Sequence, residues 1–221
     1  MSTAAPTPPL FRTRNAVPVR RSVPPLENGD RLTSAEFLRR YEATPELKKA
    51  ELIEGTVYMP PPVSISSHAI PGGIIQIWLG CYALEHPYLE LVPNGTYLLD
   101  TGNTPQPDAI LCTIPRPGGR VWLNSKDYLC GAPELVCEVA ATSASIDLHQ
   151  KFAAYERAGV QEYLVWLTVE KRVRWFELKD GKFVQKKERT GKLSSTVFPG
   201  LILDVKALLK HDRRRVVAAL K

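Results

Sequence analysis

The 221-residue chain has only four cysteines and four histidines, and these residues are not arranged as a metal motif. The cysteines stand at positions 81, 112, 130 and 137, so there is no Cys-x-x-Cys pair and no histidine at zinc spacing. This pattern excludes the common structural zinc sites and a disulfide scaffold. Cys112 and Cys137 lie in apolar segments and are expected to be small core residues. A reducing cytoplasm is the expected location.

Several other features are missing, and each absence removes a class of protein. No apolar run is long enough to cross a bilayer, so we expect no membrane span. Residues 1–27 lack the continuous apolar core of a secretory signal. There is no glycine-rich phosphate loop, no Gly-x-Ser-x-Gly elbow and no internal repeat. P-loop nucleotide hydrolases, serine hydrolases of that type and repeat proteins are therefore not expected.

The net charge of +6 belongs to the two ends of the chain. Residues 1–27 carry +3 and residues 206–221 carry +5, which leaves −2 for residues 28–205. Basic ends of this kind attract phosphate backbones, although they can equally serve solubility. We therefore expect a Pro- and Arg-rich disordered arm over residues 1–30 and a basic tail over residues 210–221.

The remaining residues, 31–209, predict one domain of mixed α/β fold. Residues 114–132 are rich in Pro and Gly and are interpreted as a plain loop. The other segments predict helices or strands by their periodicity: a helix opened by a capping box at 33–36, two strands turning at Gly55, an apolar helix over 70–84, strands at 109–112 and 135–140, a helix over 151–158, a strand at 162–167, a hairpin over 173–184, and a last strand at 201–205 before a short helix.

The most informative residue is Glu138, which stands inside an apolar strand that begins after Pro133. Alternation along a strand puts Glu138 on the same face as Val136 and Ala140. A buried ionised carboxylate is unfavourable unless it is paired or coordinates a metal. Something on that face of the sheet is therefore expected to use the charge.

Asp108 is the expected partner of Glu138, because it stands at the entrance of another short apolar strand. If the two strands are neighbours, both carboxylates point to the same place. Two converging carboxylates suit Mg²⁺ or Mn²⁺, which prefer oxygen ligands and share phosphate oxygens. On the following helix, Asp147 and Lys151 are four residues apart and hence on one face. This combination is typical of metal-assisted phosphodiester hydrolysis.

At this point the residues resemble a known family, the Uma-type branch of the PD-(D/E)XK restriction endonuclease superfamily. The resemblance covers most of the chain between about residues 33 and 209. It rests on the following spaced set: Glu51-Leu52-Ile53-Glu54-Gly55, His68, Pro107-Asp108, Glu138-Val139, Asp147, Lys151, Tyr155, Gly159-Val160 and Glu162-Tyr163.

The resemblance implies a restriction-endonuclease-like mixed β-sheet flanked by helices, with a strand-rich C-terminal extension. It implies that Asp108 and Glu138 hold Mg²⁺ (or Mn²⁺) and that Lys151, displaced from the strand to the helix, assists the attacking water. The implied activity is hydrolysis of DNA phosphodiester bonds, with RNA as the other candidate substrate, and a homodimer would suit double-strand cleavage. The chain departs from the family after Glu138-Val139: the family usually has a hydrophobic residue followed by Ser-Pro-Ser or Ser-Pro-Thr, whereas this chain has Ala140-Ala141-Thr142-Ser143. The loop loses a proline, but the metal ligands are kept.

Three further residues are supporting candidates. The resemblance implies that a carboxylate near the 50–59 hairpin joins the site, and Glu51 is a better candidate than Glu54, which stands at the turn. His68, at the start of the apolar helix, can contact phosphate, although a histidine at a helix start is more often structural. Asp147 can support the site or simply cap its helix.

The same residues also have explanations that need no activity. Asp108 can be a turn residue, Glu138 and Lys151 can form a structural ion pair, and Lys151 can be a solvated helix lysine. These explanations must hold together, which favours an active site. The alternative function is a catalytically inactive nuclease-fold protein that binds nucleic acid or protein.

Overall fold

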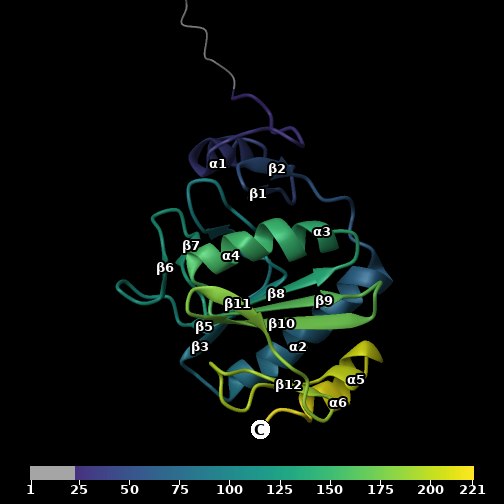
Figure 1. Ribbon diagram of the computed structural model, residues 1–221. Helices are drawn as coiled ribbons and strands as arrows, with labels where there is room; N and C mark the ends of the chain where they lie inside the picture. Colours follow the sequence, from purple (N-terminus) through teal and green to yellow (C-terminus); the bar gives the residue numbers. More distant parts are fainter. Residues whose placement is uncertain (1–22) are drawn as a thin grey trace, which may run out of the picture.

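The computed structural model describes residues 23–221 (Figure 1). The first 22 residues, which make up most of the predicted 1–30 arm, lie outside the described residues. No helix in the described part of the chain is long and apolar enough to cross a membrane.

A six-stranded mixed sheet forms the centre of the fold, with strand order β11-β10-β9-β8-β5-β3. Strands β8 and β9 are parallel, and the other neighbours are antiparallel. This confirms the predicted mixed α/β architecture. The strands are β3 (Leu89–Val92), β5 (Ala109–Thr113), β8 (Leu135–Ala140), β9 (Glu162–Leu167), β10 (Arg172–Lys179) and β11 (Lys182–Gln185).

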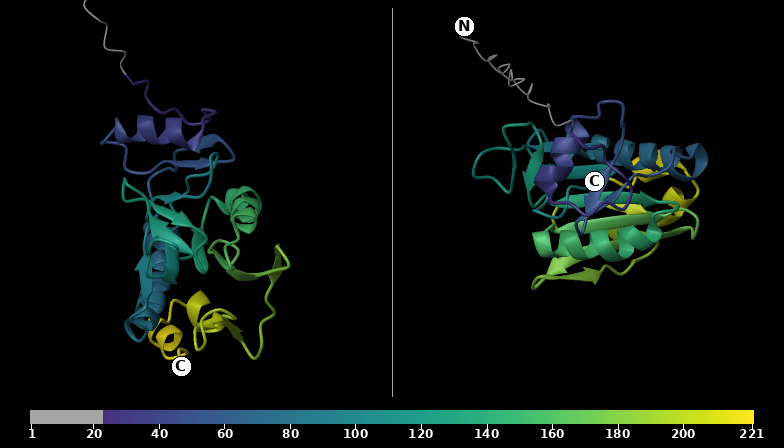
Figure 2. Two further views of the ribbon diagram at one scale, coloured as in Figure 1. Left: turned by 90° about the vertical axis from the view of Figure 1, so that its left-hand side faces the viewer. Right: turned by 90° about the horizontal axis from the view of Figure 1, so that it is seen from above.

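Helices cover both faces of this sheet (Figures 1 and 2). On one face lies α2 (Ile70–Leu84), together with the C-terminal elements; on the other lies α4 (Phe152–Ala158). The side chains of β8 are all buried and point alternately to the two faces: Leu135 and Cys137 pack toward α2, whereas Val136 packs toward α4. This alternation is the period-2 pattern of a strand buried on both faces.

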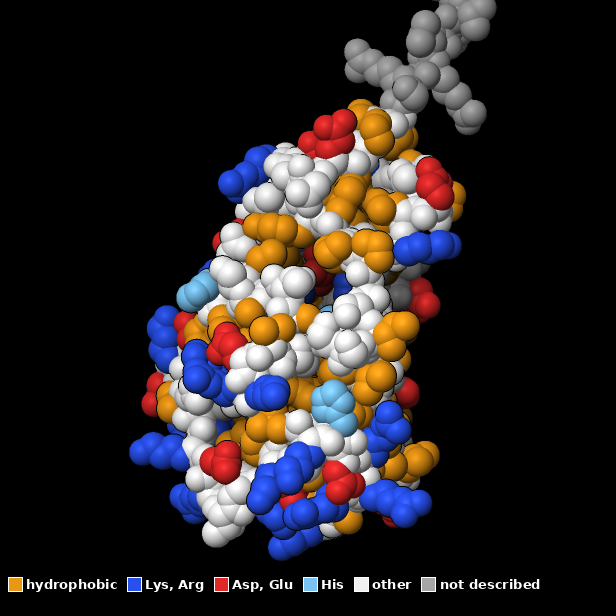
Figure 3. Space-filling model, turned by 90° about the vertical axis from the view of Figure 1, so that its right-hand side faces the viewer, with side chains coloured by type: hydrophobic (Ala, Val, Ile, Leu, Met, Phe, Trp, Pro, Cys, Tyr) orange, Lys and Arg blue, Asp and Glu red, His pale blue; other side chains and the backbone are white. Residues whose placement is uncertain are grey.

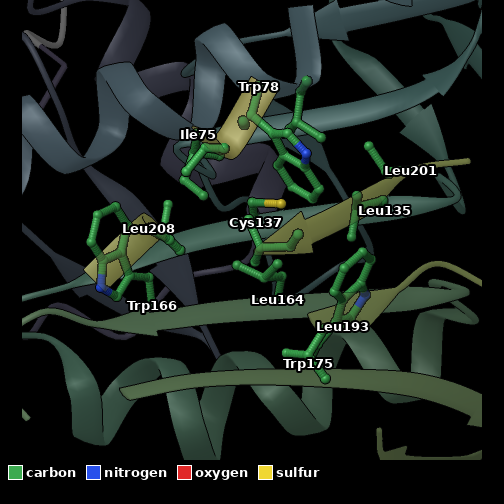
Figure 4. Close-up of a cluster of buried hydrophobic side chains, with 14 of the residues drawn as sticks. Ile75, Trp78, Leu135, Cys137, Leu164, Trp166, Trp175, Leu193, Leu201 and Leu208 are labelled. Atoms are coloured by element: carbon green, nitrogen blue, oxygen red, sulfur yellow. The ribbon is translucent and has the colours of Figure 1, made fainter. Parts of the chain in front are cut away.

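The core on the α2 side contains three tryptophans and many aliphatic side chains (Figure 4). Trp78 of α2 meets Trp175 of β10 edge to face, with 5.8 Å between the ring centroids. Cys137 lies among these side chains, as expected for a small core residue. The described chain contains no disulfide, because all four cysteines are free.

Helix α2 spans the predicted residues 70–84, and a further helical turn precedes it. A π-helical turn, η1 (Ile65–Ala69), runs directly into α2 and carries His68. Pro71-Gly72-Gly73 is an unfavourable sequence for a helix start, but the segment lies inside a continuous helical stretch. Pro71 falls in the first turn of α2, where a missing amide donor is tolerated.

The N-terminal segment sits above one edge of the sheet (Figure 1). It comprises α1 (Ser34–Glu42) and the hairpin of β1 (Glu51–Ile53) and β2 (Thr56–Tyr58). Thr33 caps α1 by accepting a hydrogen bond from the Glu36 amide, which confirms the predicted helix start. Phe37, Leu52 and other apolar side chains form a separate small core here.

The prediction of a plain loop over residues 114–132 is wrong. It contains β6 (Val121–Leu123) and β7 (Leu129–Gly131), which form a three-stranded sheet with β4 (Tyr97–Leu98). The two strands are short, and Trp122 and Leu123 remain largely exposed. Strands of three residues with an exposed apolar side chain give neither a buried run nor a clear alternation in the sequence.

The C-terminal part adds two strands, β12 (Lys192–Ser194) and β13 (Ile202–Asp204), and two short helices, α5 (Val205–Leu209) and α6 (Arg213–Val217). Residues 210–221, predicted as a basic tail, contain α6, and Val216 is fully buried against the α2 core. The arginines of this segment are exposed, so its charge lies on the surface while its apolar residues pack inside.

Candidate functional site

The antiparallel pairing of β5 and β8 brings the two predicted carboxylates together. Ala109 pairs with Cys137, and one further step along this register places Asp108 opposite Glu138. Asp108 Oδ2 accepts a hydrogen bond of 2.8 Å from the amide of Val139. Both carboxylates are buried, with exposed fractions of 4% and 3%. Asp108 is therefore fixed beside β8 and is more than a turn residue.

Lys151 reaches Glu138 from the helical segment that follows β8. This segment runs through α3 (Ala144–Ile146) and a π-helical turn, η2 (Asp147–Lys151), into α4. Lys151 Nζ lies 3.0 Å from Glu138 Oε1, and the Tyr155 hydroxyl donates to the same oxygen at 3.0 Å. Lys151 is 4% exposed, so it is not a solvated helix lysine.

Glu51 enters the site from the N-terminal hairpin. Its Oε1 atom lies 2.9 Å from Lys151 Nζ and also accepts a 2.7 Å hydrogen bond from the Gln106 amide. Glu54, the other glutamate of the hairpin, is exposed and pairs with Arg157. The structure thus places Glu51, and not Glu54, beside Lys151.

Three carboxylates surround the Lys151 ammonium, because Asp147 Oδ1 lies 3.5 Å from it as well. Burial disfavours the charged lysine, but the three carboxylates outweigh burial and hold the pKa of Lys151 well above its ordinary value. Burial raises the pKa of Glu138 to about 8; the Lys151 charge opposes this shift, and the neighbouring carboxylates add to it. Lys151 is accordingly a permanent ammonium ion in this site.

Asp147 does not cap its helix. Its Oδ2 atom accepts a hydrogen bond from the Ser143 hydroxyl, and its Oδ1 atom is buried with no hydrogen-bond partner in the described structure. The 3.5 Å contact with Lys151 provides charge but is too long for a good hydrogen bond. Burial, the largest influence, raises the pKa of Asp147.

Two basic side chains flank Asp108. His68 Nε2 of η1 lies 3.4 Å from Asp108 Oδ2, and Lys49 Nζ lies 3.9 Å from Oδ1. Burial alone would raise the pKa of Asp108, but the hydrogen bond and charge of His68 and the charge of Lys49 outweigh it, so the pKa is lowered. Asp108 is therefore ionised at neutral pH.

A cavity of about 160 Å³ opens between β1, η1 and the loop after β8, and most of these side chains line it: Lys49, Glu51, His68, Asp108, Glu138 and Lys151. On the face shown in Figure 3, acidic and basic atoms are visible at the bottom of a hollow beneath the N-terminal segment. Its rim includes Pro61, Ser64 and Thr142. The cavity connects the buried charges with solvent, so a small ion or a phosphate group can reach them.

The charges of this site do not balance within the protein. Four carboxylates face only two ammonium groups, those of Lys49 and Lys151, so the carboxylates outnumber the cations. The pKa of Glu138, raised to about 8 chiefly by burial, means that the metal-free site offsets part of this surplus by holding a proton. Within the described structure, Glu51 Oε2 and Glu138 Oε2 accept no hydrogen bond, and neither belongs to the fully buried unsatisfied atoms. Carboxylate oxygens with excess negative charge suit a hard divalent cation.

Among the described residues, no three His, Cys, Asp or Glu side chains already stand close enough to form a metal cage. Mg²⁺ does not need such a cage, because it usually keeps several waters and takes one or two carboxylates. The donor set of the cavity and the excess of carboxylates therefore fit a divalent ion whose remaining ligands are water or substrate.

Sequence reasoning assigned no role in this site to Lys49 and Tyr155, although Tyr155 belongs to the family pattern and the sequence contains a signal for each. Lys49 is two residues before Glu51, so an extended chain puts both on one face. Tyr155 is four residues after Lys151, so a helix puts both on one face. Neither residue is a candidate to ligate a metal or to activate water. Lys49 instead contacts Asp108, and Tyr155 donates a hydrogen bond to Glu138.

Residues 34–206 match the model of the Uma2 family, which is described as "Putative restriction endonuclease". The chain belongs to this family. The Uma2 match confirms the family resemblance seen in the sequence, and it includes all six predicted site residues. No curated protein matches the chain.

A solved structure supports the fold of this Uma2 family member. The crystal structure of a "putative nuclease belonging to DUF820" from Anabaena variabilis superposes with a TM-score of 0.64. The two chains are 15% identical, and the match covers 81% of this chain and 98% of the other. At this identity the similarity establishes the fold alone, a mixed sheet with flanking helices.

Proposed function

We propose that this Uma2 family protein is a metal-dependent endonuclease that hydrolyses phosphodiester bonds of DNA. The observation that carries the proposal is the buried site where Glu51, Glu138 and Asp147 meet Lys151, with Asp108 opposite Glu138, so that carboxylates outnumber ammonium groups. A purely structural ion pair would not need four carboxylates around two ammonium groups. Family membership supports the reaction class.

Asp108 and Glu138 would hold a divalent cation, Mg²⁺ or Mn²⁺, with Glu51 and Asp147 as supporting carboxylates. A bound ion of this kind acts as a Lewis acid on the phosphodiester. The protein orients the two carboxylates in advance: the Val139 amide fixes Asp108, and Lys151 and Tyr155 fix one oxygen of Glu138. Preorganised ligands of this kind avoid a rearrangement during the reaction.

Lys151 would assist as a cation and not as a base. Its pKa lies well above the ordinary value, so at neutral pH it has no free lone pair to accept a proton. A fixed ammonium ion can donate a hydrogen bond to the attacking water or to a phosphate oxygen as negative charge develops. His68, 3.4 Å from Asp108, is placed at the same cavity and can contact the phosphate.

The runner-up function is a nuclease-fold protein that binds nucleic acid or protein without cleaving it. The departure from the family pattern after Glu138-Val139 favours this alternative, since Ala141 and Thr142 replace the usual Ser-Pro and the loop loses a proline. In either case the four free thiols suit a reducing compartment such as the cytoplasm. A homodimer would allow cleavage of both DNA strands.

Cleavage of supercoiled plasmid DNA in the presence of Mg²⁺ or Mn²⁺ tests the proposal. We expect the wild type to nick the plasmid and Glu138→Gln and Asp108→Asn to lose this activity. The nicking rate of Lys151→Met should fall by about a hundredfold or more. The exposed Glu46→Gln is the matched control and should retain full activity. Circular dichroism of each variant separates lost chemistry from lost folding.

Three results would count against the endonuclease. A folded wild type that cleaves neither DNA nor RNA with either metal, yet binds them, would favour the binding protein. Equal cleavage by the wild type and Glu138→Gln would mean that the reaction occurs elsewhere. Cleavage that persists in excess EDTA would contradict the need for a metal.

A further inference from the structure

A second cavity adjoins the candidate active site on the face shown in Figure 3. It has a volume of about 220 Å³ and lies between η1, the turn that joins β9 to β10, and the end of α5. Ser67 lines both this cavity and the candidate active site. The Thr168 hydroxyl donates a 2.8 Å hydrogen bond to the carbonyl of Ser67, which holds the turn against η1. The two cavities are therefore fixed side by side.

The second cavity has an apolar part, formed by Trp166, Val169 and Leu209, and a part that presents hydrogen-bond donors and positive charge. Ser66, Ser67, Lys171 and His211 line it. Among the described residues, none of these four side chains has a hydrogen-bond partner, and the ammonium of Lys171 and the ring of His211 have no acidic partner. The one acidic neighbour in the turn, Glu170, is exposed and contacts Arg172 at 3.9 Å. Unused hydroxyl and ammonium donors around a small cavity are suited to the oxygens of a phosphate group.

Basic residues continue from this cavity over the C-terminal helices. Lys206, Lys210, Arg213 and Arg214 are exposed, and the described structure gives them no acidic partner. Figure 3 shows Lys and Arg side chains gathered on the lower part of the face, where α5 and α6 lie. Val216 of α6 is buried in the core and holds this segment in place, so the backbone that carries these charges has a fixed position. Fixed cations along a surface attract a polyanion more effectively than a single small anion.

We infer that the cavity of Ser66, Ser67, Thr168, Lys171 and His211 binds a backbone phosphate of a nucleic acid. The inference rests on the proposed function, because the same strand would present another phosphodiester to Glu138 in the adjoining cavity. The surface of Lys206, Lys210, Arg213 and Arg214 then carries the flanking backbone. Binding here positions the substrate without reading its sequence, because phosphate contacts fix register and orientation but do not distinguish bases.

Binding of a fluorescent DNA duplex to the full chain in EDTA tests the inference, since no cleavage is needed. The variant Lys171→Glu/Lys210→Glu should bind the duplex at least roughly tenfold more weakly. The slope of log affinity against log salt concentration should also be smaller in magnitude by about 2, because two phosphate contacts are lost. Ser66→Ala/Ser67→Ala, which changes no charge, should weaken binding a few fold. The matched control is Lys187→Glu/Lys192→Glu, two exposed lysines of another basic cavity beside β11 and β12.

Equal weakening by the control pair would show that only total charge matters and would overturn the inference. Unchanged binding by the Lys171 and Ser66 variants would overturn it as well, and so would displacement of the duplex by inorganic phosphate at the same phosphate concentration. If the wild type binds DNA through Lys171 but never cleaves it, the proposed nuclease fails while this inference stands.

Discussion

At the scale of single residues, the site depends on one buried lysine shared by three carboxylates. Lys151 contacts Glu51, Glu138 and Asp147 within 3.5 Å, and all four side chains are buried. Breaking such a group by removing one partner is strongly destabilising, because it leaves uncompensated charge out of water. The lysine therefore contributes to stability as well as to the proposed chemistry.

We predict that Lys151→Met lowers the free energy of unfolding by about 3 kcal/mol at neutral pH, without metal. Urea denaturation followed by circular dichroism measures this. The matched control is Lys126→Met, since Lys126 pairs with Glu42 on the surface and its side chain is 55% exposed. That change should lower the free energy of unfolding by less than about 1 kcal/mol. Similar losses in both variants would contradict the description of Lys151 as the centre of a buried charge cluster.

The raised pKa of Glu138 predicts how stability depends on pH. Burial raises this pKa from 4.5 to about 8, so the folded protein binds the proton more tightly than the unfolded chain. Protonated Glu138 therefore stabilises the folded protein: this stabilisation is greatest below pH 4.5 and is lost as the pH rises through about 8. In EDTA, the urea midpoint of the wild type should fall over this range more than that of Glu138→Gln. If the urea midpoint of Glu138→Gln depended on pH in the same way as that of the wild type, Glu138 would not be the group with the raised pKa.

At the scale of elements, the sequence predicts what is long, periodic or buried on both faces. Strand β8 and helix α2 follow directly from their apolar runs, and the Thr33 cap marks the start of α1. Strands β6 and β7 escape prediction because three-residue strands with an exposed Trp122 show no period. The π-helical turns η1 and η2 also have no local signal, although they carry His68 and Lys151.

Helix α6 gives a prediction at this scale. Val216 is fully buried against the α2 core, in a segment whose charge suggests a free tail. Val216→Ala should lower the free energy of unfolding by about 1–3 kcal/mol, because it leaves a cavity. The partly exposed Val217→Ala is the control and should lower it less. Thermal denaturation measures both variants, and an unchanged Tm for Val216→Ala would mean that α6 does not pack in solution.

At the scale of the whole molecule, the site joins parts of the chain that are far apart in sequence. Glu51 and Lys151 are 100 residues apart and yet hydrogen-bonded. The meeting of Asp108 and Glu138 could be predicted, since two apolar strands with carboxylates at matching places are candidates for pairing. The approach of Glu51 was expected only from the family resemblance, because no local pattern fixes how the N-terminal segment sits on the sheet.

The central claim is that the surplus negative charge around Glu138 and Asp108 is a binding site for a divalent cation. Mn²⁺ titration of metal-free protein, followed by calorimetry, tests it most directly, with Glu138→Gln and Asp108→Asn as site variants and Glu46→Gln as control. We predict saturable binding by the wild type and Glu46→Gln, a corresponding rise in Tm, and loss of both in the two site variants. Absence of binding by folded wild type, or equal binding by Glu138→Gln, would contradict the claim.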